Sequence, residues 1–378
     1  MDASVNNKSS FPIFKKNSPD DSDKFQPLPE PPGVYPFHLD LQKILPGNIS
    51  QKLVFQMVGD TGSVRKPDFQ KLVVSRMIKQ FQETDMKTDN PKFLYHLGDV
   101  VYNFGEASNY PAQFFNPYQN YPGPIFAIPG NHDGDINPVS PNTYNSLDAF
   151  TKVFCNTDQT PIPFCGDTNN LGNTQPNFFW TLQTSLANII GLYSNVTKYG
   201  VITKKQKEWF KEELKVANEQ RPEKAVLVCL HHSPYSADTN HGSSLAMITF
   251  LEDAFSDTGV RPDIVFSGHV HNYQRFEKTY TDGASIPFIV AGGGGYDELH
   301  PLAGENDPSC VNDSPYLKGV RLLNYCDDRH GFLKITLERK NSNLTLTGEY
   351  YAITARVDKN DKVEEAPIDI LELSFDKI

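Results

Sequence analysis

The residues most able to do chemistry in this chain stand directly after short apolar stretches. GDTG follows LVFQMV and contains Asp60, while GDVVY follows FLYHL and contains Asp99 and Tyr102. Further along the chain, GNHD follows IFAIP, HHSP follows AVLVCL, and GHVH follows DIVFS. Carboxylate, phenol, amide and imidazole groups are all metal ligands. The pattern therefore predicts a metal site assembled from several strand ends.

Each motif taken alone has an ordinary structural interpretation. A Gly-Asp step after a strand is usually a turn, and Asn131 in GNHD suits a turn that tolerates left-handed geometry. A histidine pair is usually one buried and one exposed residue. The prediction depends on the conjunction, because functional groups collect at the carboxyl ends of strands in open α/β sheets. Residues scattered over more than half the chain can converge there.

The elements that must position these residues follow an alternating pattern. Apolar runs of strand length are separated by segments with helical periodicity, at 69–81, 203–220 and 244–255. This alternation predicts βαβ units around a largely parallel sheet. The last strands of the chain, from FIVAGGGGY onward, alternate in a way more typical of antiparallel pairing. The segment 135–182 is loop-rich and is expected to form an insertion over one face.

Composition limits the classes of partner. The chain has 378 residues, a formal net charge of -11 and a pI near 5.4, which argue against nucleic acid or an anionic membrane as a partner. A phosphate-handling enzyme of this charge needs a local cation, and a metal is the obvious source. No apolar run reaches the roughly 18 residues needed to span a bilayer. The N-terminus has no apolar signal region, so the cytoplasm is the default expectation, with a secreted or periplasmic location left open.

The ordered motifs carry a resemblance to a known family. GDTG, GDVVY, GNHD, HHSP and GHVH, with the continuations GHVHNYQR and AGGGGY, resemble the signature of calcineurin-like metallophosphoesterases over about residues 52 to 350. Within that superfamily they resemble the purple acid phosphatase branch. The resemblance implies a four-layer α/β/β/α sandwich with mixed sheets and a metal site at the strand carboxyl ends. We expect an extended arm at 1–50 and one metallophosphoesterase catalytic domain at 51–378.

Tyr102 distinguishes the branch. Most of the superfamily begins with Asp-x-His, but here the histidine position is Gly62, and in the purple acid phosphatases a tyrosine supplies the missing ligand. A phenolate is a hard anionic donor and favours Fe(III), whereas imidazole and amide ligands suit a divalent Fe, Zn or Mn ion. The resemblance implies that Asp99 bridges two ions. The implied ligands of the first ion are Asp60, Asp99, Tyr102 and His271, and those of the second are Asp99, Asn131, His232 and His269.

The choice between the adjacent histidines follows the family pattern. The family histidine stands before a residue-Pro step, and His232-Ser-Pro fits this spacing. By strand periodicity His231 points to the opposite side, and we expect it to pack or to support a ligand.

The resemblance also implies a reaction. A trivalent and a divalent ion outweigh two aspartates, a tyrosinate and one hydroxide, so the site is cationic enough to hold phosphate. The implied activity is hydrolysis of small phosphate monoesters by direct attack of a metal-bound hydroxide. His132 and His241 resemble the family histidines that contact phosphate and protonate the leaving group. Asp133 is expected to orient His132 or a ligand.

Two other functions remain open at this point. A phosphodiesterase or nucleotide pyrophosphatase could use the same metals, and the insertion at 135–182 would set the difference. A non-catalytic binding module is a third possibility. Such a module should have lost ligands, whereas every ligand that the resemblance implies is present in this sequence.

Overall fold

The structure is a computed structural model that describes residues 8–17, 19–47, 50–82, 89–158, 160–165, 171–353 and 366–375. Its α-helices are α1 Leu41–Ile44, α2 Pro67–Lys79, α3 Asn116–Tyr118, α4 Asn131–Gly134, α5 Asp148–Phe154, α6 Lys204–Asn218 and α7 Leu245–Thr258. Short turns of 3₁₀ or π-helix are η1 Ser22–Lys24, η2 Ala107–Asn109, η3 Pro111–Phe115 and η4 Pro315–Leu317. The strands are β1 Phe14–Lys15, β2 His38–Asp40, β3 Lys52–Val58, β4 Leu94–His96, β5 Ile125–Ala127, β6 Trp180–Gln183, β7 Ala187–Gly191, β8 Ala225–Leu230, β9 Ile264–Ser267, β10 Tyr273–Thr279, β11 Ser285–Ala291, β12 Cys310–Val311, β13 Val320–Cys326, β14 Gly331–Lys340, β15 Asn343–Ala352 and β16 Asp369–Phe375.

Two mixed sheets form the centre of the molecule. One sheet has the strand order β13-β10-β11-β9-β8-β7-β6-β2, and the other has the order β16-β15-β14-β3-β4-β5. β7, β8, β9 and β11 run parallel in the first sheet, and β3, β4 and β5 run parallel in the second. The later strands add antiparallel pairs at β10–β11, β10–β13, β14–β15 and β15–β16. The carboxyl ends of the parallel strands carry the motifs.

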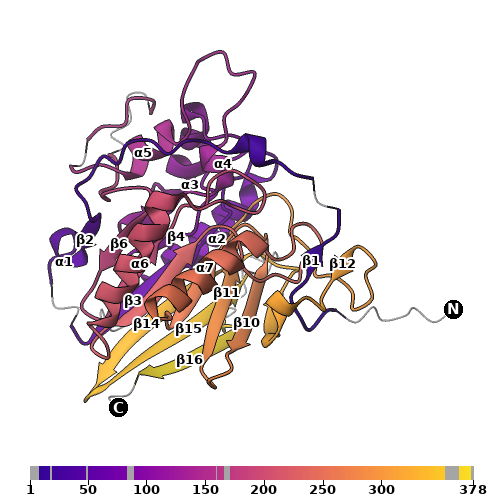
Figure 1. Ribbon diagram of the computed structural model, residues 1–378. Helices are drawn as coiled ribbons and strands as arrows, with labels where there is room; N and C mark the ends of the chain where they lie inside the picture. The colour runs from indigo at the N-terminus through magenta and orange to yellow at the C-terminus, as the bar shows by residue number, and fades with distance from the viewer. Residues whose placement is uncertain are drawn as a thin grey trace, which may run out of the picture.

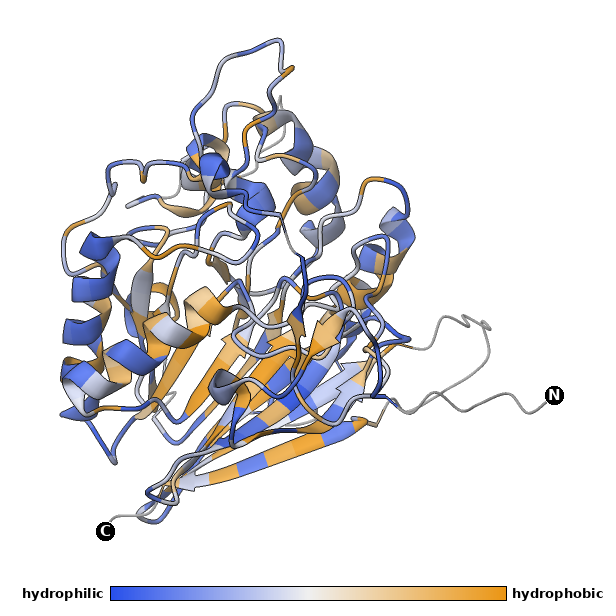
Figure 2. Ribbon diagram, turned by 45° about the vertical axis from the view of Figure 1, so that its right-hand side comes forward, coloured by the Kyte–Doolittle hydropathy of each residue, from blue (hydrophilic) through white to orange (hydrophobic). Residues whose placement is uncertain are grey.

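Helices cover the outer faces of both sheets. α6 packs on β7 and β8 with α7 beside it, while α2 packs against β14 of the other sheet. Figure 1 shows α6 and α7 in front of the strands and α2 behind them. In Figure 2 the strands in the middle are mostly orange, whereas α6 is blue on its outward side. This arrangement confirms the predicted four-layer α/β/β/α sandwich.

Local sequence signals explain the helix boundaries. The α6 N-terminus is capped by Thr203, whose hydroxyl accepts from Gln206 N–H, and α7 is capped in the same way by Ser244. α7 ends at Gly259, which has a φ of 67°. β8 is buried along its whole length, as a strand between two parallel neighbours must be. The three helices predicted from periodicity are all present.

Several features differ from the sequence prediction or extend it. The insertion is not loop throughout, because Ala149, Phe150, Val153 and Phe154 bury one side of α5. Part of the expected arm joins the fold, with β2 pairing in parallel with β6 and β1 pairing with β12. The five cysteines of the chain are free in the structure. Among the described residues, no helix is long and apolar enough to cross a membrane.

Candidate metal centre

The candidate centre lies where strand ends from the two sheets meet. β3, β4 and β5 lead into the Asp60, Asp99 and Asn131 motifs, and β8 and β9 of the other sheet lead into the histidine motifs. Backbone hydrogen bonds join neighbouring turns: Asp60 N–H donates to Gly98 O at 3.0 Å, and Gly268 N–H donates to the His231 carbonyl at 3.0 Å. The site is therefore held by backbone contacts on both sides.

One group of donors surrounds the Tyr102 hydroxyl. That oxygen lies 3.1 Å from Asp60 Oδ1 and 3.1 Å from His271 Nε2, and His271 Nε2 lies 3.6 Å from Asp60 Oδ1. The side chain of Tyr102 is buried between the rings of His132 and Tyr296. The structure brings together the three residues that were predicted to bind only the first ion.

A second group surrounds the Asn131 amide. Asn131 Oδ1 lies 3.1 Å from His231 Nε2 and 3.0 Å from His269 Nδ1. His231 Nε2 lies 3.3 Å from Asp99 Oδ2. The potential ligand atoms of Asp99, His231 and His269 all lie within 4.8 Å of one another. The Asp99 carboxylate also raises the pKa of Tyr102, which indicates that it lies near both groups.

Of the two adjacent histidines, His231 contacts the Asn131 amide and the Asp99 carboxylate. His232 Nδ1 pairs with Ser194 Oγ at 2.7 Å. The choice of His232 as ligand stays a prediction, because its Nε2 is buried without a hydrogen-bond partner, and β8 ends at Leu230, so strand alternation does not extend to the two histidines. His232 packs against the His269 ring, with the ring centroids 4.3 Å apart.

Close backbone packing fixes the His231 ring. His231 Nδ1 lies 2.9 Å from the Leu97 carbonyl and donates its proton there, which leaves Nε2 free to face Asn131 and Asp99. Gly98 has a φ of 97°, and a Cβ at this position would lie 2.6 Å from His231 Nδ1. Only glycine allows this contact.

The other imidazoles of the centre also have defined tautomers. His271 Nδ1 donates to Glu298 O at 3.1 Å, and His132 Nδ1 donates to the Asn103 carbonyl. In both rings Nε2 is the nitrogen left for a ligand or substrate. Such backbone contacts orient metal-binding histidines and raise their basicity.

Three of the candidate ligands have left-handed backbone conformations. The φ angles are 58° for Asp60, 54° for Asp99 and 68° for His269. Such a conformation costs a residue with a side chain roughly 1–2 kcal/mol. Strain of this kind concentrates at functional sites, because the surrounding structure must impose it. Here it turns each side chain toward the junction of the two sheets.

Burial makes the charges of the centre costly without a cation. Burial raises the pKa of Asp60 well above its usual value, and the neighbouring Asp99 charge adds to this. Burial alone would raise the pKa of Asp99 as well, but His231 and His132 hold it below its usual range. Burial and the two carboxylates raise the pKa of Tyr102.

The donor set fits a pair of metal ions. Ligands about 2 Å from one ion stand about 3 Å from each other, which is the spacing of Asp60, Tyr102 and His271 and of Asn131, His231 and His269. A cation would also compensate the two buried carboxylates and allow Tyr102 to bind as phenolate. The residues present therefore suit metal binding at both groups.

The predicted substrate-side histidines pack against different donor groups. His132 packs against Tyr102 with a centroid distance of 4.4 Å, and the His132 backbone N–H donates to Asp99 Oδ1. His241 packs against His269 at 4.1 Å. Asp133 does not contact the His132 side chain, and its carboxylate instead accepts from the N–H groups of Val100, Val101 and Gly130. Its role is to hold the GDVVY turn.

Other residues of the site were not foreseen. Tyr296 covers Tyr102 and His271, His300 stacks on His271 with a centroid distance of 4.0 Å, and Asp238 lies buried beneath His241. The signal for Tyr296 and His300 was the glycine run AGGGGY, which ends a strand like the other motifs do. Asp238 gave a weaker signal, an acidic residue three positions before a candidate histidine.

The chain matches a family of known proteins. The family model of the calcineurin-like phosphoesterases matches residues 55–273, which contain every candidate ligand. The chain belongs to the calcineurin-like phosphoesterases. Part of this phosphoesterase is 30% identical over 183 residues to Fe(3+)-Zn(2+) purple acid phosphatase 12 of Arabidopsis thaliana, which covers 47% of this chain and 33% of that protein. It is also 30% identical over 187 residues to purple acid phosphatase 1 of Ipomoea batatas, covering 45% and 35%.

The chain thus matches about a third of the length of these curated relatives. Among solved structures, the phosphoesterase resembles GAP50, the anchor in the inner membrane complex of Plasmodium, with a TM-score of 0.55 and 19% identity over 86% of this chain and 90% of that one. At this identity the likeness concerns the fold alone.

Proposed function

We propose that this phosphoesterase is a binuclear metal-dependent phosphatase of the purple acid phosphatase type, acting on small phosphate monoesters. The observation that carries the proposal is the pairing of two donor groups across one carboxylate. Asp60, Tyr102 and His271 form one group, and the other contains Asn131, His231 and His269. Asp99 interacts with members of both.

The chemistry of the donors supports an iron ion beside a divalent ion. The group around Tyr102 offers a carboxylate and a phenol oxygen, which are hard donors suited to Fe(III). The group around Asn131 offers two imidazoles and a neutral amide, which suit a divalent Fe, Zn or Mn ion. Purple acid phosphatase 12, with which part of this chain is 30% identical, is described as an Fe(3+)-Zn(2+) protein.

When bound, the two ions would hold the phosphoryl oxygens and lower the pKa of a water that attacks phosphorus. The chain's own residues do the rest. In the attack, an oxygen–phosphorus bond forms and the bond from phosphorus to the ester oxygen breaks. The electron pair stays on that ester oxygen, which takes up a proton and leaves as an alcohol. His132, which packs on Tyr102, and His241, which packs on His269, would contact the phosphate and supply that proton.

Metal analysis and visible spectroscopy test this function. Protein produced with iron and zinc and purified without chelators should contain two transition-metal ions per chain and show a tyrosinate-to-Fe(III) absorption band. It should hydrolyse an aryl phosphate monoester faster than the matching diester. A protein without stoichiometric transition metal would overturn the proposal. A metal-loaded protein that prefers the diester would favour the phosphodiesterase alternative.

A further inference from the structure

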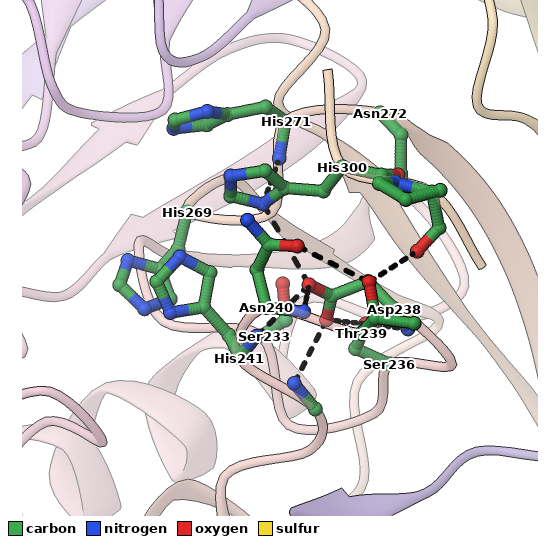
Figure 3. Close-up of polar contacts among 12 residues, drawn as sticks. Ser233, Ser236, Asp238, Thr239, Asn240, His241, His269, His271, Asn272 and His300 are labelled. Carbon is green, nitrogen blue, oxygen red and sulfur yellow. Dashed lines mark hydrogen bonds and ion pairs between the residues drawn. The ribbon is translucent and has the colours of Figure 1, made fainter. Parts of the chain in front are cut away.

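The loop at 236–243 places His241 against the second donor group and is fixed by several hydrogen bonds. It follows β8 and places the His241 ring 4.1 Å from His269 and 4.9 Å from His300, as ring centroids. Figure 3 shows the His241 ring beside His269, with Asp238 enclosed by its own loop. His241 Nδ1 is buried without a hydrogen-bond partner. No side-chain hydrogen bond thus fixes this nitrogen, and the ring depends on its backbone for position.

Asp238 is the internal anchor of the loop. Its side chain is fully buried, and Oδ2 accepts from the N–H groups of Asn240 at 2.8 Å and His241 at 2.9 Å. Oδ1 accepts from Gly242 N–H at 2.8 Å and from the Ser236 hydroxyl at 2.8 Å. One carboxylate therefore fixes the backbone on both sides of His241. An ionised carboxylate binds such donors more strongly than a neutral amide would.

The same carboxylate faces the other side of the centre. Asp238 Oδ2 lies 3.6 Å from His300 Nδ1, and His300 Nδ1 accepts from the His271 backbone N–H at 3.2 Å. The His300 ring stacks on the His271 ring. Asp238 thus lies between the loop of His241 and a ring packed on a candidate ligand, as the dashed contacts in Figure 3 indicate.

The N-terminal arm closes the loop from outside. Ile13 N–H donates to Ser236 O at 2.8 Å, and Ser243 N–H donates to Ile13 O at 2.7 Å. The Lys15 ammonium donates to Thr239 O at 2.5 Å. Gly242, with a φ of 68°, allows the close approach, because a Cβ there would lie 3.1 Å from Ile13. The arm brackets both ends of the loop.

We propose that Asp238 and the arm together position His241 to protonate the leaving group. This inference rests on the proposed phosphatase function. Asp238 is a positioning residue that acts through the backbone of His241, and Ile13 and Lys15 complete the support. The proton goes from the His241 ring to the ester oxygen as its bond to phosphorus breaks, and the ring regains a proton from solvent after the product leaves.

Leaving-group dependence tests the inference. A nitrophenolate leaves without a proton, whereas an alkoxide needs one. Asp238→Asn should therefore lower kcat/KM for an unactivated alkyl phosphate at least about tenfold more than for 4-nitrophenyl phosphate. General acid catalysis contributes roughly 10²–10⁴-fold, and mispositioning the acid should lose part of that contribution. His241→Ala should show the same pattern, and the double variant should lose little more than His241→Ala alone.

Two further variants keep the test decisive if Asp238→Asn does not fold. Lys15→Met removes the contact from the arm to Thr239, and we expect a smaller change in the same ratio of rates. Asp263→Asn is the matched control, because its carboxylate accepts the Val226 N–H at the opposite end of β8. That variant should lower stability and leave the ratio unchanged.

The outcomes separate the two proposals. An equal loss on both substrates in Asp238→Asn and Lys15→Met, or additive losses in the double variant, would overturn the positioning role while the phosphatase function stands. A wild-type protein that binds no transition metal and hydrolyses neither substrate would overturn the function itself. Metal content should stay at the wild-type level in each variant of the loop and arm.

Discussion

The two donor groups of the centre differ in charge and in how they are held. The Asp60–Tyr102–His271 group offers two oxygen donors and one imidazole around a buried hydroxyl. The Asn131–His231–His269 group offers a neutral amide and two imidazoles, and Asp99 is the carboxylate beside it. One sheet supplies most of the oxygen donors and the other sheet supplies the imidazoles. The fold therefore takes oxygen donors and imidazoles from different sheets, and each group combines ligands from both.

The largest expected effect comes from removing the residue common to both groups. Asp99→Asn keeps the shape of the side chain but removes its charge, so we expect both ions to bind weakly and activity on an aryl phosphate to fall by more than about 100-fold, because losing a group that merely supports a ligand already costs roughly 10–100-fold. Metal content and turnover measure this. Full retention of both ions would show that the groups are independent.

Variants of the two adjacent histidines test which of them binds an ion with the second group. His231→Asn should remove the divalent ion and lower kcat/KM by more than about 100-fold, whereas His232→Asn should keep both ions and stay within about tenfold of the wild type. The reason is that His231 faces Asn131 while His232 pairs with Ser194. Divalent-metal content decides between them. Loss of the ion in His232→Asn alone would show that His232 is the ligand, as the sequence predicted.

Tyr102→Phe addresses the first group alone. We expect loss of the visible absorption band and a fall in Fe(III) affinity of at least about 10-fold, because the phenol oxygen is the only atom removed. The divalent ion should remain, since Tyr102 has no contact with Asn131 among the hydrogen bonds of the described residues. A spectrum identical to the wild type would contradict the assignment of Tyr102 as a ligand.

Metal removal should lower the stability of the protein. Ions held at about 1,000 times their dissociation constant stabilise a protein by about 4 kcal/mol, so chelation should lower the melting temperature by several degrees. The loss should be smaller in Tyr102→Phe, which starts with one group weakened. Differential scanning calorimetry measures both shifts. An unchanged melting temperature on chelation would mean that the fold needs no metal.

The sequence predicted the elements better than the details of the site. Long periodic helices such as 204–218 and fully buried strands such as Ala225–Leu230 leave a clear pattern, and both appeared as expected. The strand ends also indicated which motifs converge. The pattern could not tell His231 from His232, because the alternation that would separate them stops where the strand stops. Which histidine faces Asn131 depends on the contacts of His231 with Leu97 and Gly98, which follow β4 of the other sheet.

Asp238 was missed for a different reason. Its partners are backbone N–H groups of its own loop, and any short polar loop offers such groups. What makes it notable is complete burial beside the histidines, and burial there is created by the arm and by the segment around His300. The sequence predicted an extended arm at 1–50 but gave no sign of what it would cover.

The arm has a consequence for how the protein is made. Lys15 and its partner Thr239 are 224 positions apart, and Lys8 and its partner Asp327 are 319 positions apart. Because these partners are synthesised later than the arm, the arm cannot dock until they have emerged. Contacts of such long separation form slowly. We therefore expect docking of the arm to be a late step of folding.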